Sequence, residues 1–228
     1  MYTNHFYLAV EGPIGVGKTT LARILRDELG GDLLLEVFEE NPFLSDFYED
    51  RARYAFQTQI FFLLSRYRQQ HDSVSAILAR TPLVSDYLFA KDRLFAQLNL
   101  AGDELAVYEH VHTALSEKIV LPSLVIHLRA ATDVLMSRIA VRDRSYERTM
   151  SRDYIDALRA TYDRFFAGYS QAPLLTIDSS DLNFVVNEED RRYVVSLVRT
   201  ALQQGVYQQA LPDFTWVQPT ADSQETLL

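Results

Sequence analysis

The chain has 228 residues, and its 31 acidic residues outnumber 22 lysines and arginines to give a net charge of −9. Hydrophobic residues make up 48% of the chain, which is enough for one sizeable core and excludes a disordered protein. The acidic balance argues against a general nucleic-acid-binding protein, which would carry a basic surface. Because there is no cysteine, disulfide scaffolds, thiol catalysis and thiolate metal sites are excluded.

Short apolar segments alternate with longer segments of helical periodicity. The apolar segments at residues 6–10, 33–37, 83–85, 124–128 and 174–177 are predicted to be five buried strands. Helical periodicity is found at about 18–29, 52–70, 87–99, 103–119, 131–142, 151–168 and 188–204. This alternation predicts an α/β fold in which a parallel sheet is covered by helices on both faces. No linker divides the chain, so we expect one domain over residues 1–228, with a C-terminal tail at about 206–228.

No segment approaches the ~20 apolar residues of a membrane span. The first ten residues carry no lysine or arginine, unlike a signal peptide. We therefore expect a cytoplasmic protein with neither a membrane nor a nucleic acid as its partner.

The strongest local signal is a glycine-rich motif, Gly-x4-Gly-Lys-Thr, between the first predicted strand and the first predicted helix. Backbone N–H groups of such a turn and of the helix N-terminus cradle a triphosphate. Lys18 would reach the transferred phosphate, and the hydroxyl of Thr19 would bind Mg²⁺. The alternative, a glycine-rich turn with a chance lysine, is disfavoured by the strand and helix on either side. The residues predicted to bind ATP are Gly12, Pro13, Ile14, Gly15, Val16, Gly17, Lys18, Thr19 and Thr20.

Acidic residues gather at the ends of the next two predicted strands. Residues 27–50 contain nine Asp or Glu and no lysine or arginine, which disfavours a phosphorylated acceptor. Glu36 lies at the end of the second strand, where ligands bind in open α/β sheets, and could accept the proton of an attacking hydroxyl. Most of the other acids fit a solvated surface. Asp86 follows the third strand and could hold Mg²⁺ or, alternatively, cap a helix that starts at Tyr87.

Basic residues gather later in the chain. Residues 138–152 contain five arginines and two acids, a local charge of +3 in an acidic protein. Arg138 and Arg142 share one helix face, and Arg144 follows the helix end. We predict that they belong to an arginine-rich lid, at about 142–150, that closes over a triphosphate and neutralises its charge. A solvated helix end would account for only one or two of these arginines.

A further set of side chains follows one stripe of the helix predicted at 52–70. Gln59, Phe62 or Leu63, and Arg66 fall on this stripe, since seven residues make nearly two turns. A glutamine amide can pair with a base edge, and an arginine can bond base acceptors such as N7 and O6. Core packing with a salt bridge at the rim explains the pattern equally well, so the sequence leaves both readings open.

Taken in order, these motifs resemble the deoxynucleoside kinase family, of the bacterial deoxyguanosine/deoxyadenosine kinase type. The resemblance covers residues 5–205. It rests on Glu-Gly-Pro-Ile-Gly-Val-Gly-Lys-Thr-Thr (11–20), Glu36 with Glu-Asn-Pro-Phe-Leu-Ser-Asp-Phe-Tyr (40–48), Phe-Gln-Thr-Gln (56–59) with Ser-Arg-Tyr (65–67), Ser-Asp-Tyr-Leu-Phe-Ala-Lys-Asp-Arg-Leu-Phe-Ala (85–96), and Arg138 with Arg-Asp-Arg-Ser-Tyr-Glu (142–147). It implies a P-loop kinase fold, ATP and Mg²⁺, and a dimer formed through helices 52–70 and 103–119.

The resemblance also implies a role for each matching residue. Glu36 is similar to the family's base for the 5′-hydroxyl, whereas Tyr48 and Glu147 resemble the residues that hold the sugar 3′-hydroxyl. Residues 183–189 lie where such enzymes surround the donor adenine. Gln59 resembles the amide that pairs with the base, and Arg66 with Asp92 resembles the pair that reads the base edge. The lid arginines of the family are matched by Arg138, Arg142 and Arg144.

The chain departs from the family pattern at three positions. Val37 replaces the proline that many members place after the base. Tyr87 stands where many relatives have an arginine near the 5′-hydroxyl, so Arg93 or a lid arginine could take that role. Asp143 replaces a lid glycine, which removes flexibility and one unit of local positive charge.

We therefore expect transfer of the ATP γ-phosphate to the 5′-hydroxyl of a purine deoxynucleoside, deoxyguanosine or deoxyadenosine, in nucleotide salvage. A deoxycytidine-preferring kinase is the first alternative, because the Arg66–Asp92 pair suits purines or cytosine better than thymine. A nucleoside monophosphate kinase of the thymidylate type is the second, and phosphorylation of dTMP alone would identify it. A non-catalytic ATP-binding module is the third, and it would bind ATP without turnover.

Overall fold

The computed structural model describes residues 5–37, 41–144, 147–148 and 150–204. The predicted tail at 206–228 and part of the predicted lid lie outside these residues. Five strands form one parallel sheet, as the sequence predicts, and their order is β2-β3-β1-β4-β5. They are β1 (Tyr7–Glu11), β2 (Asp32–Leu34), β3 (Leu83–Ser85), β4 (Leu124–Arg129) and β5 (Leu174–Asp178).

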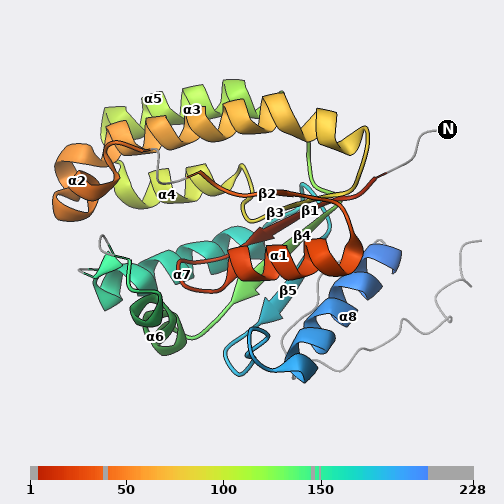
Figure 1. Ribbon diagram of the computed structural model, residues 1–228. Coiled ribbons are helices and arrows are strands. Elements are labelled where there is room, and N and C mark those ends of the chain that lie inside the picture. Colours follow the sequence, from red (N-terminus) through yellow and green to blue (C-terminus); the bar gives the residue numbers. More distant parts are fainter. Residues whose placement is uncertain (1–4, 38–40, 145–146, 149, 205–228) are drawn as a thin grey trace, which may run out of the picture.

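Helices cover both faces of the sheet (Figure 1). Their bounds are α1 (Lys18–Leu29), α2 (Leu44–Glu49), α3 (Arg51–Leu78), α4 (Lys91–Asn99), α5 (Gly102–Ser116), α6 (Thr132–Arg142), α7 (Arg152–Ala167) and α8 (Glu188–Gln204). The long helices α3 and α5 lie side by side over α4, on the opposite side of the sheet from α8. No helix in the described part of the chain is long and apolar enough to cross a membrane.

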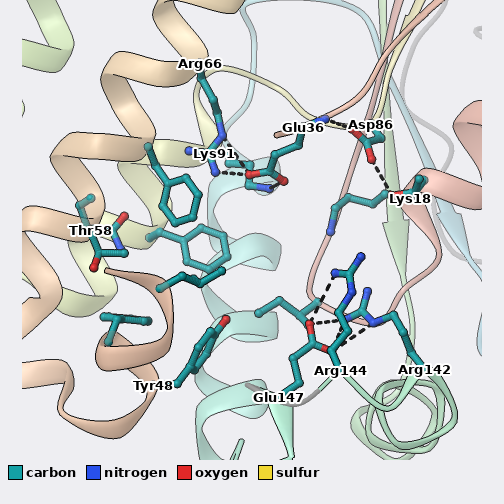
Figure 2. A pocket seen from close by; sticks show the side chains of 17 residues that line it. Lys18, Glu36, Tyr48, Thr58, Arg66, Asp86, Lys91, Arg142, Arg144 and Glu147 are labelled. Carbon is teal, nitrogen blue, oxygen red and sulfur yellow. Dashed lines mark hydrogen bonds and ion pairs between the residues drawn. The ribbon is translucent and has the colours of Figure 1, made fainter. Parts of the chain in front are cut away.

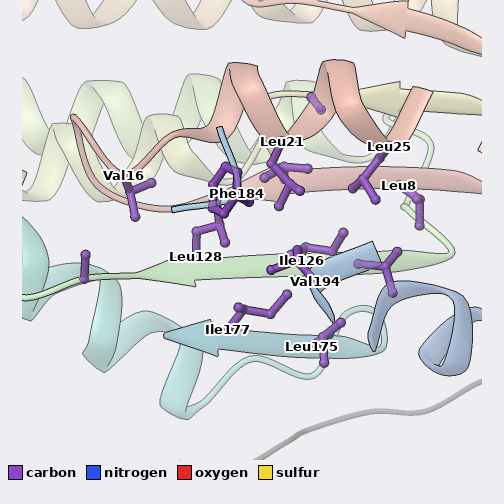
Figure 3. Packing of buried hydrophobic residues seen from close by; sticks show 14 of the residues in the cluster. Leu8, Val16, Leu21, Leu25, Ile126, Leu128, Leu175, Ile177, Phe184 and Val194 are labelled. Carbon is purple, nitrogen blue, oxygen red and sulfur yellow. The ribbon is translucent and has the colours of Figure 1, made fainter. Parts of the chain in front are cut away.

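The alternation of side chains along each strand divides the core between the two faces. Leu8 and Val10 of β1 pack on one face against α1 and α8, through residues such as Leu21 and Val194 (Figure 3). Tyr7 and Ala9 point to the other face and pack against α3, α4 and α7. A third apolar cluster joins α2, α3, α4 and α5 outside the sheet. Because both faces are buried, the strands appear in the sequence as continuous apolar runs.

The second predicted strand is shorter than its apolar run. β2 ends at Leu34 instead of continuing to residue 37. The next two backbone groups are bonded by side chains in place of a neighbouring strand: Gln69 Nε2 donates to the Leu35 carbonyl at 2.8 Å, and the Glu36 N–H donates to Asp86 Oδ1 at 2.7 Å. Side chains therefore take the place of the hydrogen bonds between strands, and Glu36 lies outside the sheet.

Several predicted helix ends are wrong, and tertiary contacts explain them. The helix predicted at 52–70 begins under the cap of Asp50 and continues to Leu78, because Val74 is buried against the sheet. The helix predicted at 87–99 begins only at Lys91, because the Leu88 N–H is bonded to Glu11 Oε2 at 2.8 Å. Asp86 therefore does not cap that helix. The helices predicted at 103–119, 131–142 and 151–168 each differ by one to three residues at an end.

Helix α2 has no counterpart among the predicted helices. It follows an Asn-Pro turn in which the Phe43 N–H donates to Asn41 Oδ1 at 3.0 Å. Its buried Phe47 packs against α3 in the third cluster, and this contact stabilises six residues that are too short to form a helix alone.

Candidate active site

A pocket lies at the carboxyl end of β1, β2 and β3 and continues between α2, α3 and the segment after α6 (Figure 2). Parallel strands bring the loops that follow them to one edge of the sheet, so residues far apart in sequence meet there. The pocket is lined by Ile14, Lys18, Thr19, Glu36, Leu44, Phe47, Tyr48, Thr58, Gln59, Phe62, Arg66, Asp86, Lys91, Phe95, Arg142, Arg144 and Glu147.

The glycine-rich loop connects β1 to α1 as predicted. Gly12, Gly15 and Gly17 have φ angles of 153°, 83° and 103°, which side chains disfavour. A Cβ at Gly15 would also approach Ile139 Cγ1 to 2.8 Å, so the loop packs closely on α6. No side chain caps α1, which leaves the N–H groups of its first turn to bind an anion.

Lys18 extends along the inside of this loop. Its ammonium donates to the carbonyls of Gly12 at 2.7 Å and Pro13 at 3.1 Å, and it faces the pocket. Burial, reinforced by the positive charge of Lys91, lowers the pKa of Lys18 to about 8. The loop therefore combines free N–H donors with a cation, which is what a phosphate chain needs.

Asp86 joins the loop to the end of β2. Its Oδ2 accepts the hydroxyl of Thr19 at 2.5 Å, and its Oδ1 accepts the backbone N–H of Glu36 at 2.7 Å. β3 is the neighbour of both β1 and β2, so the aspartate that follows it reaches the segments that follow both strands. Within the described residues no group of three or more His, Cys, Asp or Glu could hold a metal. Mg²⁺ in phosphate sites needs only one or two carboxylates besides phosphate oxygens and water, and Thr19 with Asp86 fit that requirement.

Glu36 is held by two cations at the centre of the pocket. Its Oε1 accepts Nε of Arg66 at 3.0 Å and also contacts Nη2, whereas its Oε2 accepts Nζ of Lys91 at 2.6 Å. Burial raises the pKa of Glu36, but the positive charges of Arg66 and Lys91 outweigh burial and hold that pKa well below its ordinary value. Asp92 is fully buried behind this group and pairs with Nη1 of Arg66.

Aromatic residues form the deep end of the pocket. Phe47 and Phe62 line it, and the Arg66 guanidinium lies 4.7 Å from the centre of the Phe62 ring. Gln59 is buried and lines the same end. Gln59 and Arg66 are buried and also line the pocket, and the ion pairs of Arg66 are buried instead of lying at the rim. Base recognition by this stripe stays a prediction.

The last residue of α6 and the residues after it close the opposite side. Arg142 Nη2 lies 2.6 Å from each carboxylate oxygen of the buried Glu147, and Arg144 Nη1 lies 3.8 Å from Oε1. Asp143 ends α6 with φ 49°, the left-handed conformation that usually favours glycine, and Arg148 bonds its carboxylate at 2.7 and 2.8 Å. Among the predicted lid residues, 145, 146 and 149 lie outside the described part.

Of the predicted residues 12–20, only Ile14, Lys18 and Thr19 line the pocket, and three predicted site residues outside this loop do not line it either. Arg138 bonds the backbone of Val16, Ser179 and Leu182, so it joins the glycine-rich loop to the segment after β5. Arg93 is half-exposed and pairs with Glu109 at 2.8 Å. Asp92 reaches the pocket only through Arg66. The lining still contains five cations (Lys18, Arg66, Lys91, Arg142 and Arg144) and three carboxylates, in a chain of net charge −9.

Residues 8–203 match the deoxynucleoside kinase family. The chain belongs to this family. It is similar to the deoxyguanosine kinases of Bacillus subtilis (31% identity, covering 85% of this chain and 96% of the relative) and Lactobacillus johnsonii (32%, covering 86% and 92%). It is also similar to the deoxyadenosine/deoxycytidine kinase of B. subtilis (27%, covering 86% and 92%). The structure of M. mycoides deoxyadenosine kinase with bound dATP has the same fold (TM-score 0.74, 23% identity, covering 86% and 100%).

As a deoxynucleoside kinase the chain is a phosphotransferase, and the structure adds residues that the sequence analysis gave no role. Lys91 contacts Glu36. Glu11 is fully buried and accepts the Gly12 N–H, the Leu88 N–H and the Tyr162 hydroxyl. The only signal in the sequence was position: Glu11 directly precedes the glycine-rich loop, and Lys91 directly precedes Asp92.

Proposed function

We propose that this deoxynucleoside kinase transfers the γ-phosphate of ATP to the 5′-hydroxyl of a purine deoxynucleoside. The observation that carries this proposal is the position of Glu36 between the glycine-rich loop and the aromatic end of the pocket. A carboxylate there stands between a site for phosphates and a site for a flat ring. The names of the deoxyguanosine kinase relatives support a purine as the acceptor base.

The donor site is formed by the loop at residues 12–20. Its N–H groups and Lys18 hold the phosphates, and Thr19 with Asp86 hold Mg²⁺. When bound, Mg²⁺ neutralises negative charge on the phosphates. Arg142 and Arg144 approach the same space from the opposite side, and Arg138 fixes the loop from behind.

The acceptor site extends from Glu36 toward α2 and α3. Gln59 and Arg66 bind the base edge, with Asp92 orienting Arg66, and Tyr48 and Glu147 bind the 3′-hydroxyl of the sugar. Arg66 has five N–H donors, so it retains donors for N7 or O6 of a purine after bonding Glu36 and Asp92. Phe47 and Phe62 supply apolar area around the ring.

In the reaction, the 5′-oxygen forms a bond to the γ-phosphorus while the bond to the β–γ bridging oxygen breaks. The electron pair of that bond leaves with ADP, and the 5′-hydroxyl proton passes to Glu36. The lowered pKa of Glu36 makes it a weak base, which suits a loose transition state in which the proton moves late.

A second candidate is a kinase that also accepts deoxycytidine. The relative named deoxyadenosine/deoxycytidine kinase supports it, and the Arg66–Asp92 pair suits cytosine as well as a purine. The test is a panel of four deoxynucleosides and dTMP with Mg-ATP, with each product identified by mass spectrometry. We expect 5′-monophosphates of deoxyguanosine or deoxyadenosine at the highest kcat/KM. A preference for deoxycytidine would establish the second candidate, and ATP binding without any product would contradict both.

We also propose a single domain that works in the cytoplasm, where ATP is abundant.

The chain forms a dimer through α3 and α5. Leu64 on α3 and Val107 on α5 are exposed apolar residues, and the two helices lie together away from the sheet. Light scattering after size exclusion should give twice the chain mass, and Leu64→Glu with Val107→Glu should halve it. A monomeric wild-type chain would overturn the dimer.

A further inference from the structure

Lys91 is the first residue of α4 and one of three lysines in the chain. It is 5% exposed, although lysine is seldom buried without a partner. Its ammonium lies 2.6 Å from Glu36 Oε2 and lines the pocket. The Leu88 N–H donates to the Glu11 carboxylate, and this hydrogen bond fixes the segment before α4. The backbone therefore holds Lys91 in position.

The hydrogen bonds of Lys91 leave donors available. Within the described residues, Glu36 is the one acceptor bonded to its ammonium, so two of three N–H groups can donate to a ligand. Arg66 already holds the other oxygen of Glu36. Lys91 therefore orients this carboxylate and still has hydrogen-bonding capacity on the pocket side.

Lys91 and Lys18 approach the same space from different elements. Lys18 comes from the start of α1 and Lys91 from the start of α4, and Lys91 contributes, after burial, to the lowered pKa of Lys18. Two ammonium groups that converge on the same space repel each other, and a further anion between them, besides Glu36, would relieve that repulsion. Because the donor phosphates lie at Lys18, the anion that reaches both lysines is the phosphoryl group in transfer.

We propose that Lys91 is a catalytic residue that orients Glu36 and donates hydrogen bonds to the oxygens of the transferred phosphoryl group. This inference rests on the proposed function. While the 5′-oxygen bonds to phosphorus and ADP departs with the electron pair, Lys91 keeps its own proton and Glu36 takes the hydroxyl proton. Lys91 thus takes the role near the 5′-hydroxyl that the sequence offers to Arg93 or a lid arginine, and Arg93 is paired with Glu109 instead.

The alternative role for Lys91 is structural, since its charge could merely balance the buried carboxylates Glu36 and Asp92. A structural role would be seen in the unfolding temperature and in the affinity for nucleoside alone. A catalytic role would be seen in kcat and in the affinity for an analogue that spans both substrates. These readouts separate the two roles.

The test compares Lys91→Met and Lys91→Ala with Lys118→Met, an exposed matched control. In Lys91→Met we expect kcat to fall ~10²–10³-fold, as when one donor to a transition-state oxygen is lost. KM for the nucleoside should stay within about threefold, because the interaction is made mainly in the transition state. In Lys91→Ala, added ethylamine should restore part of kcat by occupying the space of the lost side chain.

Calorimetry gives a readout without turnover. A bisubstrate analogue that joins deoxyguanosine to adenosine through a phosphate chain should bind Lys91→Met at least ~10-fold more weakly, since a charged donor to phosphate is lost. Deoxyguanosine alone should bind both variants as it binds wild type. If wild type is active and Lys91→Met keeps its kcat and its affinity for the analogue, the inference alone is overturned. If the wild type phosphorylates no nucleoside, the proposed function is overturned and the inference falls with it.

Discussion

Arg66 bonds Glu36 through Nε at 3.0 Å and through Nη2, while its Nη1 pairs with Asp92. One guanidinium on α3 therefore connects the base end of the pocket with the carboxylate at the phosphate end. All three side chains are largely buried, so their charges are stabilised mainly by one another. Base recognition and the orientation of Glu36 are consequently coupled through a single residue.

Arg66→Ala should therefore affect substrate choice, turnover and stability together. We expect the relative rates on deoxyguanosine, deoxyadenosine and thymidine to converge, and kcat to fall on each. The free energy of unfolding should drop by about 3–5 kcal/mol, because Glu36 and Asp92 lose a buried counter-charge. Steady-state kinetics and urea unfolding measure these effects.

Arg68→Ala is the matched control, since Arg68 lies on the same helix and is exposed. Arg66→Lys keeps the charge without the planar fork, and it should lose base discrimination with a smaller loss of stability. Unchanged relative rates in a folded Arg66→Ala or Arg66→Lys variant would contradict the base-reading role.

The lowered pKa of Lys18, about 8, predicts how ATP binding depends on pH. Lys18 faces Lys91, Glu11, Glu36 and Asp86, and it loses its proton as the pH rises through about 8. Binding of an anion that needs this charge should then weaken up to ~10-fold per pH unit above 8, as proton linkage requires. Calorimetric titration with Mg-ATP between pH 7 and pH 9.5 measures it.

Lys18 should also affect stability in the same range. Its pKa in the folded protein is below the ordinary 10.5, so its contribution to the free energy of unfolding should rise between pH 8 and pH 10.5. Lys18→Met should remove both dependences, whereas Lys118→Met should preserve them. A constant affinity for ATP up to pH 9.5 would refute this account of Lys18.

Glu11 holds the start of the glycine-rich loop from outside the pocket, so replacing it should lower the stability of the protein. Its carboxylate accepts three hydrogen bonds, from the N–H groups of Gly12 and Leu88 and from the hydroxyl of Tyr162. In Glu11→Gln, an NH₂ group must face one of these donors, which should cost about 1–3 kcal/mol of stability. Thermal unfolding measures this loss, and an unchanged melting temperature would show that these bonds are replaceable.

The five buried strands and the glycine-rich loop are encoded locally, which is why they could be predicted, whereas the strand order could not. Apolar runs buried on both faces define the strands, and the spacing of Gly12, Gly17 and Lys18 defines the loop. The predicted placement of Glu36 and Asp86 at strand ends also brings them together, because β2 and β3 are neighbours.

Features set by long-range contacts could not be predicted. The roles of Glu11 and Lys91 depend on bonds to residues 77 and 55 positions away in the chain. The extension of α3 depends on burial of Val74 against the sheet. Asp143 adopts the left-handed conformation that glycine would adopt, which the residue type alone does not reveal.

The central claim is that Glu36 accepts the proton of the 5′-hydroxyl, and Glu36→Gln tests it most directly. Single-turnover phosphorylation of deoxyguanosine, with nucleoside binding measured separately, should show a rate ~10²–10⁴-fold below wild type. Nucleoside affinity should change little, and the exposed matched control Glu49→Gln should react as wild type does. A Glu36→Gln variant that transfers phosphate at the wild-type rate would contradict the assignment of Glu36 as the base.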